Sequence, residues 1–217
     1  MSDFFAPFVA LPGYGIGALL ALILYAIQSE VRFGKRARAM RAGPADRWST
    51  QAVSLAAAVP VLGFALAMKA RSSTWSFLPH WFRSATLPGM PAIAWLGVVL
   101  AFSGIALRLW AVLTLRDRYT RTLLIQDEQK IERRGPYRWV RHPGYLGSLL
   151  CLNGVALASG NAVTLVASLA VTLAAYSYRI RVEDQMLVAA FGDSYDQYRR
   201  ETHALLPTRA QRGMKPG

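Results

Sequence analysis

Five stretches of the chain hold almost no charged residues and are rich in Ala, Leu, Val and Ile. A helix needs about 20 mostly apolar residues to cross the hydrocarbon core of a bilayer, which is about 30 Å thick. The pattern therefore predicts membrane-spanning helices over 11–27, 52–68, 92–115, 145–158 and 162–178. Because only three residues separate the last two, we expect them to form a tight helical hairpin, followed by a polar C-terminal helix. The predicted fold class is all-α, a polytopic integral membrane protein of about five spans.

The positions of the basic residues test this prediction independently, because cytoplasmic loops of membrane proteins carry an excess of Lys and Arg. Of the 25 Lys and Arg residues, 21 lie between the first and second spans, between the third and fourth, or after the fifth. Five spans place these three segments on one side of the membrane. We therefore expect the N-terminus outside and the C-terminal helix in the cytoplasm. The high Ala and Arg content is typical of bacteria, which favours the bacterial inner membrane as the location.

The apolar content, the single Cys and the net charge limit the classes of protein to which this chain can belong. The 53% apolar and 17% charged residues argue against disorder, and a single Cys excludes a disulfide framework or a thiolate zinc site. A formal charge of +13 first suggests nucleic acid. Membrane topology and attraction to anionic lipid account for that charge more simply. We therefore expect the bilayer as a partner, and neither nucleic acid nor metal.

One charge interrupts the predicted spans. Arg108 lies within about two turns of the cytoplasmic end of the span 92–115. A long arginine side chain at this depth can snorkel to the interface, which favours a structural role. Charges within membrane spans are nevertheless enriched at functional sites, so a functional Arg108 stays an alternative.

Most of the polar information follows residue 115. The segment 133–150 reads RRGPYRWVRHPGYLGSLL and holds two rigid turn elements, Gly135-Pro136 and His142-Pro143-Gly144. Pro143 fits the first turn of the next helix, where its missing N–H is not needed. Arginines and aromatic residues at this point are also typical of a simple interface anchor, which is the alternative to a functional segment.

A second polar cluster begins where the last span ends, with Arg179, Glu183 and Asp184 on a continuing helix. Arg179 and Glu183 are four residues apart, so a surface ion pair worth a few tenths of a kcal/mol is the simplest interpretation. The predicted hairpin, however, brings the residue-142 end of one helix beside the residue-179 end of the next. The two clusters should therefore face each other at the cytoplasmic end of one helix pair.

Five ordered motifs in this half of the chain resemble the isoprenylcysteine carboxyl methyltransferase family and its wider relatives, the phospholipid N-methyltransferases and the C-terminal part of the sterol reductases. The motifs are G-P-Y-x-x-x-R-H-P-x-Y-x-G at 135–147, E-D at 183–184, F-G at 191–192, Y-x-x-Y at 195–198 and L-P at 206–207. The resemblance covers about residues 115–207, and the first three spans add nothing diagnostic to it. It divides the chain into a membrane region (1–115), a methyltransferase core (116–207) and a basic tail (208–217).

The resemblance implies an integral-membrane methyltransferase that uses S-adenosylmethionine without a Rossmann fold, and the chain has no strand–GxGxxG–helix pattern. In the family the cofactor lies in a cytoplasm-facing pocket closed by the C-terminal segment, and a lipid substrate enters from the bilayer. The residues matching the cofactor-binding motifs are Tyr137, Arg141, His142, Pro143, Tyr145, Gly147 and Glu183. Asp184 departs from the family, which usually has a second glutamate here.

We assign Arg179 and Asp184 as catalytic candidates. A carboxylate acceptor is already ionised at neutral pH, so methyl transfer to it rests on alignment and desolvation rather than on a base. A guanidinium can hold a carboxylate through two hydrogen bonds, which makes Arg179 the candidate for binding an anionic acceptor. His142 is expected to position the cofactor, although an amine or thiol acceptor would favour a role in proton transfer.

The acceptor stays open at this point. A prenylated small-molecule or protein carboxylate follows from the resemblance, while a phospholipid amine or a small thiol are alternatives within the same enzyme class. A non-catalytic membrane scaffold that retains the fold is the alternative outside it.

The predicted topology has a direct test. Reporter fusions at residues 40, 125 and 210 should all report the cytoplasm, and one at residue 160 should report the outer side. A C-terminal fusion that reports the outer side would contradict the five-span prediction.

Overall fold

The protein is described by a computed structural model that covers residues 13–30, 46–70, 77–115 and 131–206. The regular secondary structure in these ranges is helical, apart from two isolated β-bridges, so the all-α prediction is confirmed. The helices are α2 (Gly13–Glu30), α4 (Ser49–Ala70), α5 (His80–Arg83), α6 (Ala92–Leu115), the 3-10 helix η4 (Gly135–Arg138), α7 (Pro143–Ala158), α8 (Ala162–Phe191) and α9 (Asp193–Glu201). The first part of the predicted core and the predicted basic tail lie outside the described residues.

All five predicted spans are helices. Three of them, α4, α6 and α8, are long and apolar enough to cross a membrane, and α2 and α7 are shorter apolar helices. The predicted bounds of the third span coincide with those of α6. The five-span count and the division of the chain into three units stay predictions.

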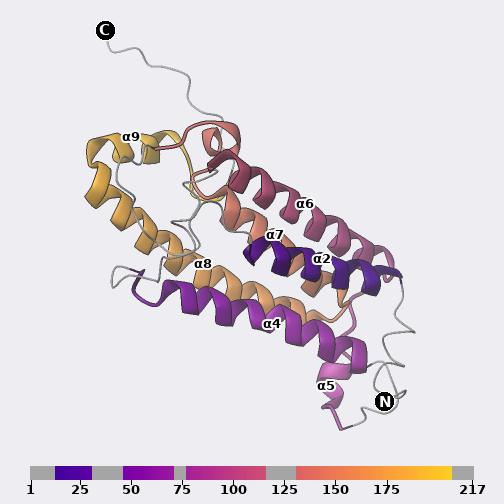
Figure 1. The fold of residues 1–217 in the computed structure, drawn as a ribbon. Helices are drawn as coiled ribbons and strands as arrows, with labels where there is room; N and C mark the ends of the chain where they lie inside the picture. Colours follow the sequence, from indigo (N-terminus) through magenta and orange to yellow (C-terminus); the bar gives the residue numbers. More distant parts are fainter. Residues whose placement is uncertain (1–12, 31–45, 71–76, 116–130, 207–217) are drawn as a thin grey trace.

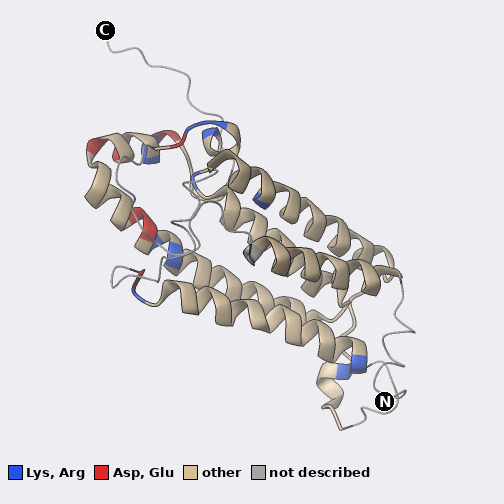
Figure 2. Ribbon diagram, in the orientation of Figure 1, with Lys and Arg blue, Asp and Glu red and all other residues tan. Residues whose placement is uncertain are grey.

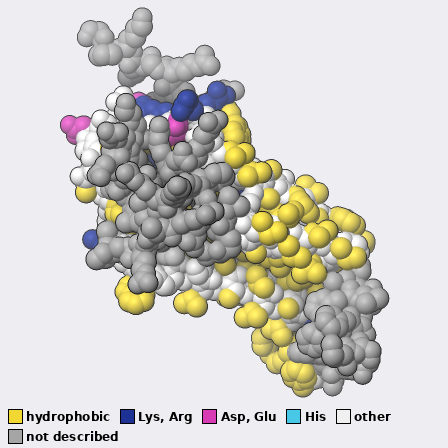
Figure 3. All heavy atoms as spheres, in the orientation of Figure 1, with side chains coloured by type: hydrophobic (Ala, Val, Ile, Leu, Met, Phe, Trp, Pro, Cys, Tyr) yellow, Lys and Arg dark blue, Asp and Glu magenta, His cyan; other side chains and the backbone are white. Residues whose placement is uncertain are grey.

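The helices form a bundle in which α6 packs along α7, and α4 packs along α8 (Figure 1). The predicted hairpin is confirmed: residues 159–161 connect α7 to α8, and the side chain of Asn161 caps α8 by accepting a hydrogen bond from the Thr164 backbone N–H at 2.9 Å. Large apolar side chains are exposed along the bundle, as Figure 3 shows on one face. In a membrane protein this surface is the one that contacts lipid.

A seam of small residues brings α6 and α7 into backbone contact. The residues alternate at spacings of four and three on both helices: Gly97, Ala101 and Gly104 on α6, and Gly147, Cys151, Gly154 and Ala158 on α7. A Cβ atom added at Gly104 would clash with the carbonyl oxygen of Gly147, and one at Gly154 would lie 2.6 Å from the carbonyl oxygen of Gly97. Small residues that allow such close approach are typical of helix pairs in membranes, where packing replaces the hydrophobic effect.

Most of the charged residues in the described part of the chain lie at one end of the bundle (Figure 2). Helix α8 has 30 residues, which correspond to ~45 Å and exceed the ~30 Å hydrocarbon core. Its polar C-terminal part therefore projects beyond the apolar part, and α9 follows after Gly192, whose φ of 53° changes the chain direction. This end of the bundle holds both predicted polar clusters.

The structure corrects the expectation for Arg108. The side chain is only 8% exposed, donates a hydrogen bond to Ser148 on α7 at 2.8 Å, and lies over the ring of Tyr25 on α2. It therefore points into the bundle rather than snorkelling toward the interface. Arg108 joins three helices below the polar end.

The small-residue seam has a measurable consequence. Gly104→Val should lower the free energy of unfolding by about 1–3 kcal/mol, because the added side chain would meet the backbone of α7, which cannot rotate away as a side chain can. Thermal unfolding in detergent measures this change. Val99→Leu, on the exposed face of α6, is the control and should unfold like the wild type. Equal stability of the two variants would show that α6 and α7 do not approach as described.

Candidate functional site

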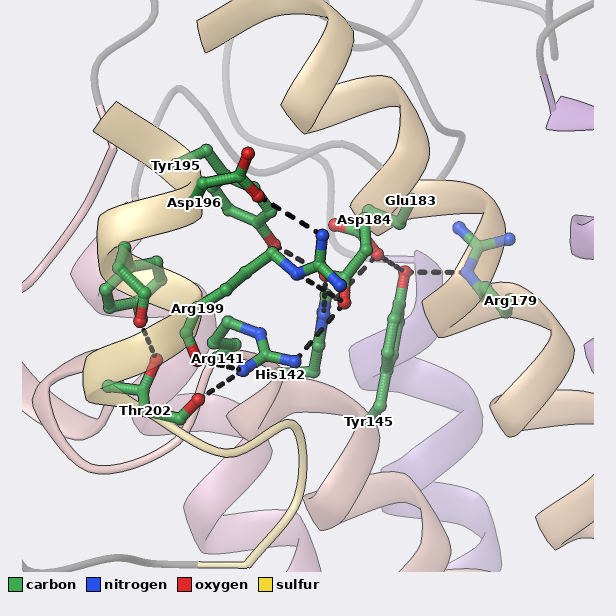
Figure 4. A network of polar contacts seen from close by, with 11 residues as sticks. Arg141, His142, Tyr145, Arg179, Glu183, Asp184, Tyr195, Asp196, Arg199 and Thr202 are labelled. Atoms are coloured by element: carbon green, nitrogen blue, oxygen red, sulfur yellow. Dashed lines mark hydrogen bonds and ion pairs between the residues drawn. The ribbon is translucent and has the colours of Figure 1, made fainter. Parts of the chain in front are cut away.

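The segment before α7 is built from rigid turns. Gly135 has a φ of 56° at the start of η4, and Pro136 is buried. Pro143 is the first residue of α7, and the residue before a proline is disfavoured in the helical conformation. His142 therefore stays outside the helix, with φ −122° and ψ 60°. The His142 side chain is 4% exposed and lies against side chains of α8 (Figure 4).

His142 and Tyr145 form a stacked pair that contacts both acids of α8 (Figure 4). The two ring centroids are 5.3 Å apart and the planes differ by 5°. His142 Nε2 lies 2.9 Å from Asp184 Oδ1, while His142 Nδ1 lies 3.6 Å from Glu183 Oε2. Tyr145 donates a hydrogen bond to Glu183 Oε2 at 2.5 Å. The predicted facing of the two clusters across the hairpin is thus what the structure shows.

The carboxylate of Asp184 is surrounded by donors from two other parts of the chain. Oδ1 accepts from His142 and, at 2.6 Å, from the hydroxyl of Tyr195 on α9. Oδ2 accepts from Arg141 at 3.3 Å and lies 4.0 Å from Nε of Arg199. The carboxylate therefore cross-links the start of α7, the extension of α8 and the helix α9.

The hydroxyl of Tyr195 is a permanent donor in this arrangement. Burial, and after it the negative charge of Asp184, raise the pKa of Tyr195 well above its ordinary value. The phenol thus stays protonated at physiological pH. Because an ionised carboxylate only accepts, His142 must also carry its proton on Nε2.

The chain after α9 returns to the RHP motif. The backbone N–H groups of Arg141 and His142 donate to the carbonyl oxygens of His203 and Ala204, at 2.9 and 3.0 Å. The Arg141 guanidinium also donates to the carbonyl oxygen of Thr202. On the other side, the Tyr198 hydroxyl donates to the carbonyl oxygen of Tyr137 at 2.5 Å. Residues 202–204 and α9 together cover the motif.

Arg179 is buried, which makes the simplest sequence interpretation, a surface pair with Glu183, wrong. Its exposed fraction is 4%. Nε donates to the Tyr145 hydroxyl at 2.7 Å, and Nη1 donates to the hydroxyls of Thr50 at 2.8 Å and Ser49 at 3.3 Å. Arg179 therefore connects the start of α4 to the pair of aromatic rings beside the acids.

The structure brings most of the sequence-predicted residues together. Arg141, His142, Tyr145, Glu183 and Asp184 form one connected group, which Arg179 joins through Tyr145. Tyr137 joins through its backbone, and Pro143 sets the start of α7.

Gly147 lies elsewhere. A Cβ atom there would be 2.6 Å from the carbonyl oxygen of Gly104 and 2.8 Å from the backbone nitrogen of Arg108. Its glycine is explained by the seam between α6 and α7, and a role in cofactor binding stays a prediction.

Sequence reasoning missed the residues at the start of α4 and just before it that meet Arg179. Asp46 Oδ1 lies 3.6 Å from Arg179 Nη1, beside Ser49 and Thr50. The sequence does single out Asp46 in one way, because it is the only acidic residue between 31 and 116. Nothing in the local sequence indicates that it lies beside a residue 133 positions later.

The arrangement offers groups of both signs to a ligand. Glu183 is 26% exposed at its side chain and uses one oxygen, Oε2, toward Tyr145 and His142. Arg141 has a buried Nε without a hydrogen-bond partner in the described part of the chain. Among the described residues, no group of three or more His, Cys, Asp or Glu could hold a metal ion.

The part of the chain that holds this group of residues is similar to a known protein family. The model of the isoprenylcysteine carboxyl methyltransferase (ICMT) family matches residues 95–189. The predicted resemblance to this family is confirmed. The match includes most of α6, so the expectation that the first three spans add nothing diagnostic is wrong for the third, and it ends before α9. The family description implies a methyl donor.

Relatives in several kingdoms share this part of the chain. A probable protein-S-isoprenylcysteine O-methyltransferase of Oryza sativa is 32% identical over 117 residues, which are 53% of this chain and 61% of that protein. The cobalt-zinc-cadmium resistance protein CzcN of Cupriavidus metallidurans is 36% identical over 129 residues, 59% of this chain and 54% of that protein. The chain thus spans little more than half the length of these relatives.

A solved structure, that of the eukaryotic intramembrane Ras methyltransferase ICMT, is similar in fold. The TM-score is 0.56 at 21% identity, over 71% of this chain and 51% of that chain. This likeness concerns the fold alone. Together with the apolar helices, it confirms the predicted polytopic integral membrane architecture.

The role of Asp184 as a cross-link can be measured. Asp184→Ala should lower the free energy of unfolding by about 3–5 kcal/mol, because it leaves buried donors of His142 and Arg141 without their acceptor. Asp196→Ala on α9 removes a carboxylate that is 41% exposed and pairs with Arg199, which should cost less than about 1 kcal/mol. Denaturation in detergent followed by tryptophan fluorescence compares the two. Similar losses in both variants would contradict the cross-link.

Proposed function

We propose that this chain is an integral-membrane, S-adenosylmethionine-dependent methyltransferase that acts on a lipid-like acceptor, with carboxyl O-methylation of an isoprenylcysteine-type substrate as its reaction. The observation that carries the proposal is the joining of His142 and Tyr145 to Glu183 and Asp184 at the polar end of the α7–α8 hairpin. These four residues lie within the part of the chain that matches the family.

The polar groups at this site suit S-adenosylmethionine. Its methionine part carries a carboxylate, for which the Nε of Arg141, which has no hydrogen-bond partner among the described residues, is a donor. Its ammonium and hydroxyl groups are donors, for which Glu183 offers a partly exposed carboxylate. When bound, the sulfonium supplies an electrophilic methyl group. His142 and Tyr145 would hold Glu183 in place, and residues 202–204 would close the site against water.

The chain's own residues divide the remaining work. Asp184 is saturated with donors, so we now assign it the positioning of His142 and Arg141 rather than contact with the substrate. Arg179 supplies a buried positive charge beside Tyr145, which suits an anionic acceptor. A carboxylate acceptor needs no base, so alignment beside Arg179 and exclusion of water are the main contributions to the rate.

The location follows from the same proposal. The exposed apolar surface of the bundle would let a prenyl or acyl chain reach the polar end from within the bilayer. With the basic residues on the cytoplasmic side, the site faces the cytoplasm of a bacterium, with the N-terminus outside.

Binding of the cofactor is the first test. The purified protein should bind S-adenosylmethionine or its demethylated product, and His142→Ala and Glu183→Ala should each weaken binding at least tenfold, because each removes a group from the proposed site. Calorimetry in detergent measures this. Asp193→Asn, an exposed acid in the first turn of α9, is the control and should bind like the wild type. Unchanged binding in both folded site variants would place the cofactor elsewhere.

Transfer is the second part of the same test. The protein is incubated with a methyl-labelled donor and, separately, with a prenylated cysteine bearing a free carboxylate, a phospholipid amine or a small thiol. Base-labile label on the prenylated cysteine is expected. Label only on the amine or the thiol would replace the carboxylate as acceptor, and cofactor binding without any transfer would favour the scaffold alternative.

A further inference from the structure

The short segment that leads into α4 is fastened to α8, although it lies outside the part of the chain that matches the family. Arg47 donates a hydrogen bond to the side chain of Gln185 at 3.0 Å, and the Tyr178 hydroxyl donates to the carbonyl oxygen of Arg47 at 2.7 Å. Arg47 and Trp48 have φ values of 46° and 63°. Left-handed backbone at two successive non-glycine residues is costly and persists where surrounding contacts hold it.

Asp46 is the buried acid of this segment, with 1% of its surface exposed. It accepts hydrogen bonds from the Ser49 hydroxyl at 2.9 Å, the Thr50 hydroxyl at 2.9 Å and the Thr50 backbone N–H at 3.1 Å. Burial acts to raise the pKa of Asp46, but these hydrogen bonds and the charge of Arg179 outweigh it, and the pKa lies below its ordinary value. Asp46 is therefore an anion at neutral pH.

A continuous chain of contacts leads from this anion to the candidate site. Arg179 Nη1 donates to the Thr50 hydroxyl at 2.8 Å and lies 3.6 Å from Asp46 Oδ1. Arg179 Nε donates to the Tyr145 hydroxyl, which in turn donates to Glu183. The guanidinium is thus held from both sides, with Asp46, Ser49 and Thr50 on one side and Tyr145 on the other.

We propose that Asp46 is a positioning residue for methyl transfer: it fixes the orientation of Arg179, and so the place where an anionic acceptor binds. This inference rests on the proposed function. An arginine side chain has several rotatable bonds, and a buried counter-ion on one edge removes that freedom and keeps the charge in place. The segment 46–50 then contributes to acceptor binding although it is far from the motifs in sequence.

The test compares Asp46→Asn with the wild type in a methyl-transfer assay on the best acceptor, alongside calorimetric binding of the demethylated cofactor. Asn keeps the shape of the side chain and removes its charge. We expect kcat/KM for the acceptor to fall at least tenfold while the Kd of the demethylated cofactor stays within twofold. Asp46→Glu should restore part of the loss. Asp193→Asn is the matched acid-to-amide control and should keep wild-type kinetics.

Coupling to Arg179 separates positioning from general stability. If Asp46 acts through Arg179, adding Asp46→Asn to Arg179→Lys should lower kcat/KM no further than Arg179→Lys alone. Thr50→Val, which removes the hydroxyl between the two charges and keeps the volume, is the second variant should Asp46→Asn fold poorly. It should show the same selective loss.

The outcomes distinguish the two claims. Wild-type kinetics in Asp46→Asn or Thr50→Val, in an enzyme that is active, overturn the role of Asp46 and leave the proposed function intact. A parallel loss of cofactor binding and turnover overturns it as well, because that is the signature of a general structural role. If the wild type transfers no methyl group to any acceptor, the proposed function fails and the role of Asp46 fails with it.

Discussion

The hydrogen bond between the Asp184 carboxylate and the imidazole of His142 is the interaction on which the polar end of this protein depends. It joins the residue before α7 to the extension of α8, and the same carboxylate holds Arg141 and the Tyr195 hydroxyl of α9. A carboxylate that is mostly hidden from water is stable only when donors surround it. The donors here come from segments far apart in sequence, so the need to satisfy one charge fixes how three elements meet.

The position of α7 at the polar end is set by a different constraint, the backbone contact between α6 and α7. Glycines at the crossing let the two helices approach closely, so α7 is held along its length by α6. His142 and Tyr145 project from the start of this fixed helix. Van der Waals packing in the membrane and electrostatics at its surface therefore act together: one places α7, and the other organises the residues around its first turn.

Much of the architecture could be predicted from sequence because it depends on local pattern. Long apolar runs and a three-residue gap predict the spans and the hairpin, and the hairpin brings the end of α7 at His142 beside the part of α8 at Arg179, one turn from Glu183 and Asp184. The environment of single charges could not be predicted. Arg179 looks like half of an exposed i, i+4 pair, and only the packing of α4 shows that it is buried against Asp46. The position of Arg108 in the sequence likewise predicts that it reaches the interface, whereas its contacts with Ser148 and Tyr25 hold it inside the bundle.

The central claim is that the cofactor lies between the start of α7 and the extension of α8. Ultraviolet cross-linking of radiolabelled S-adenosylmethionine to the purified protein, followed by mass spectrometry of the labelled peptides, tests it without relying on any variant. The account predicts label in peptides from 131–147 and from 183–204, displaced by excess demethylated cofactor. Displaceable label confined to α2, α4 or the apolar part of α6 would contradict it.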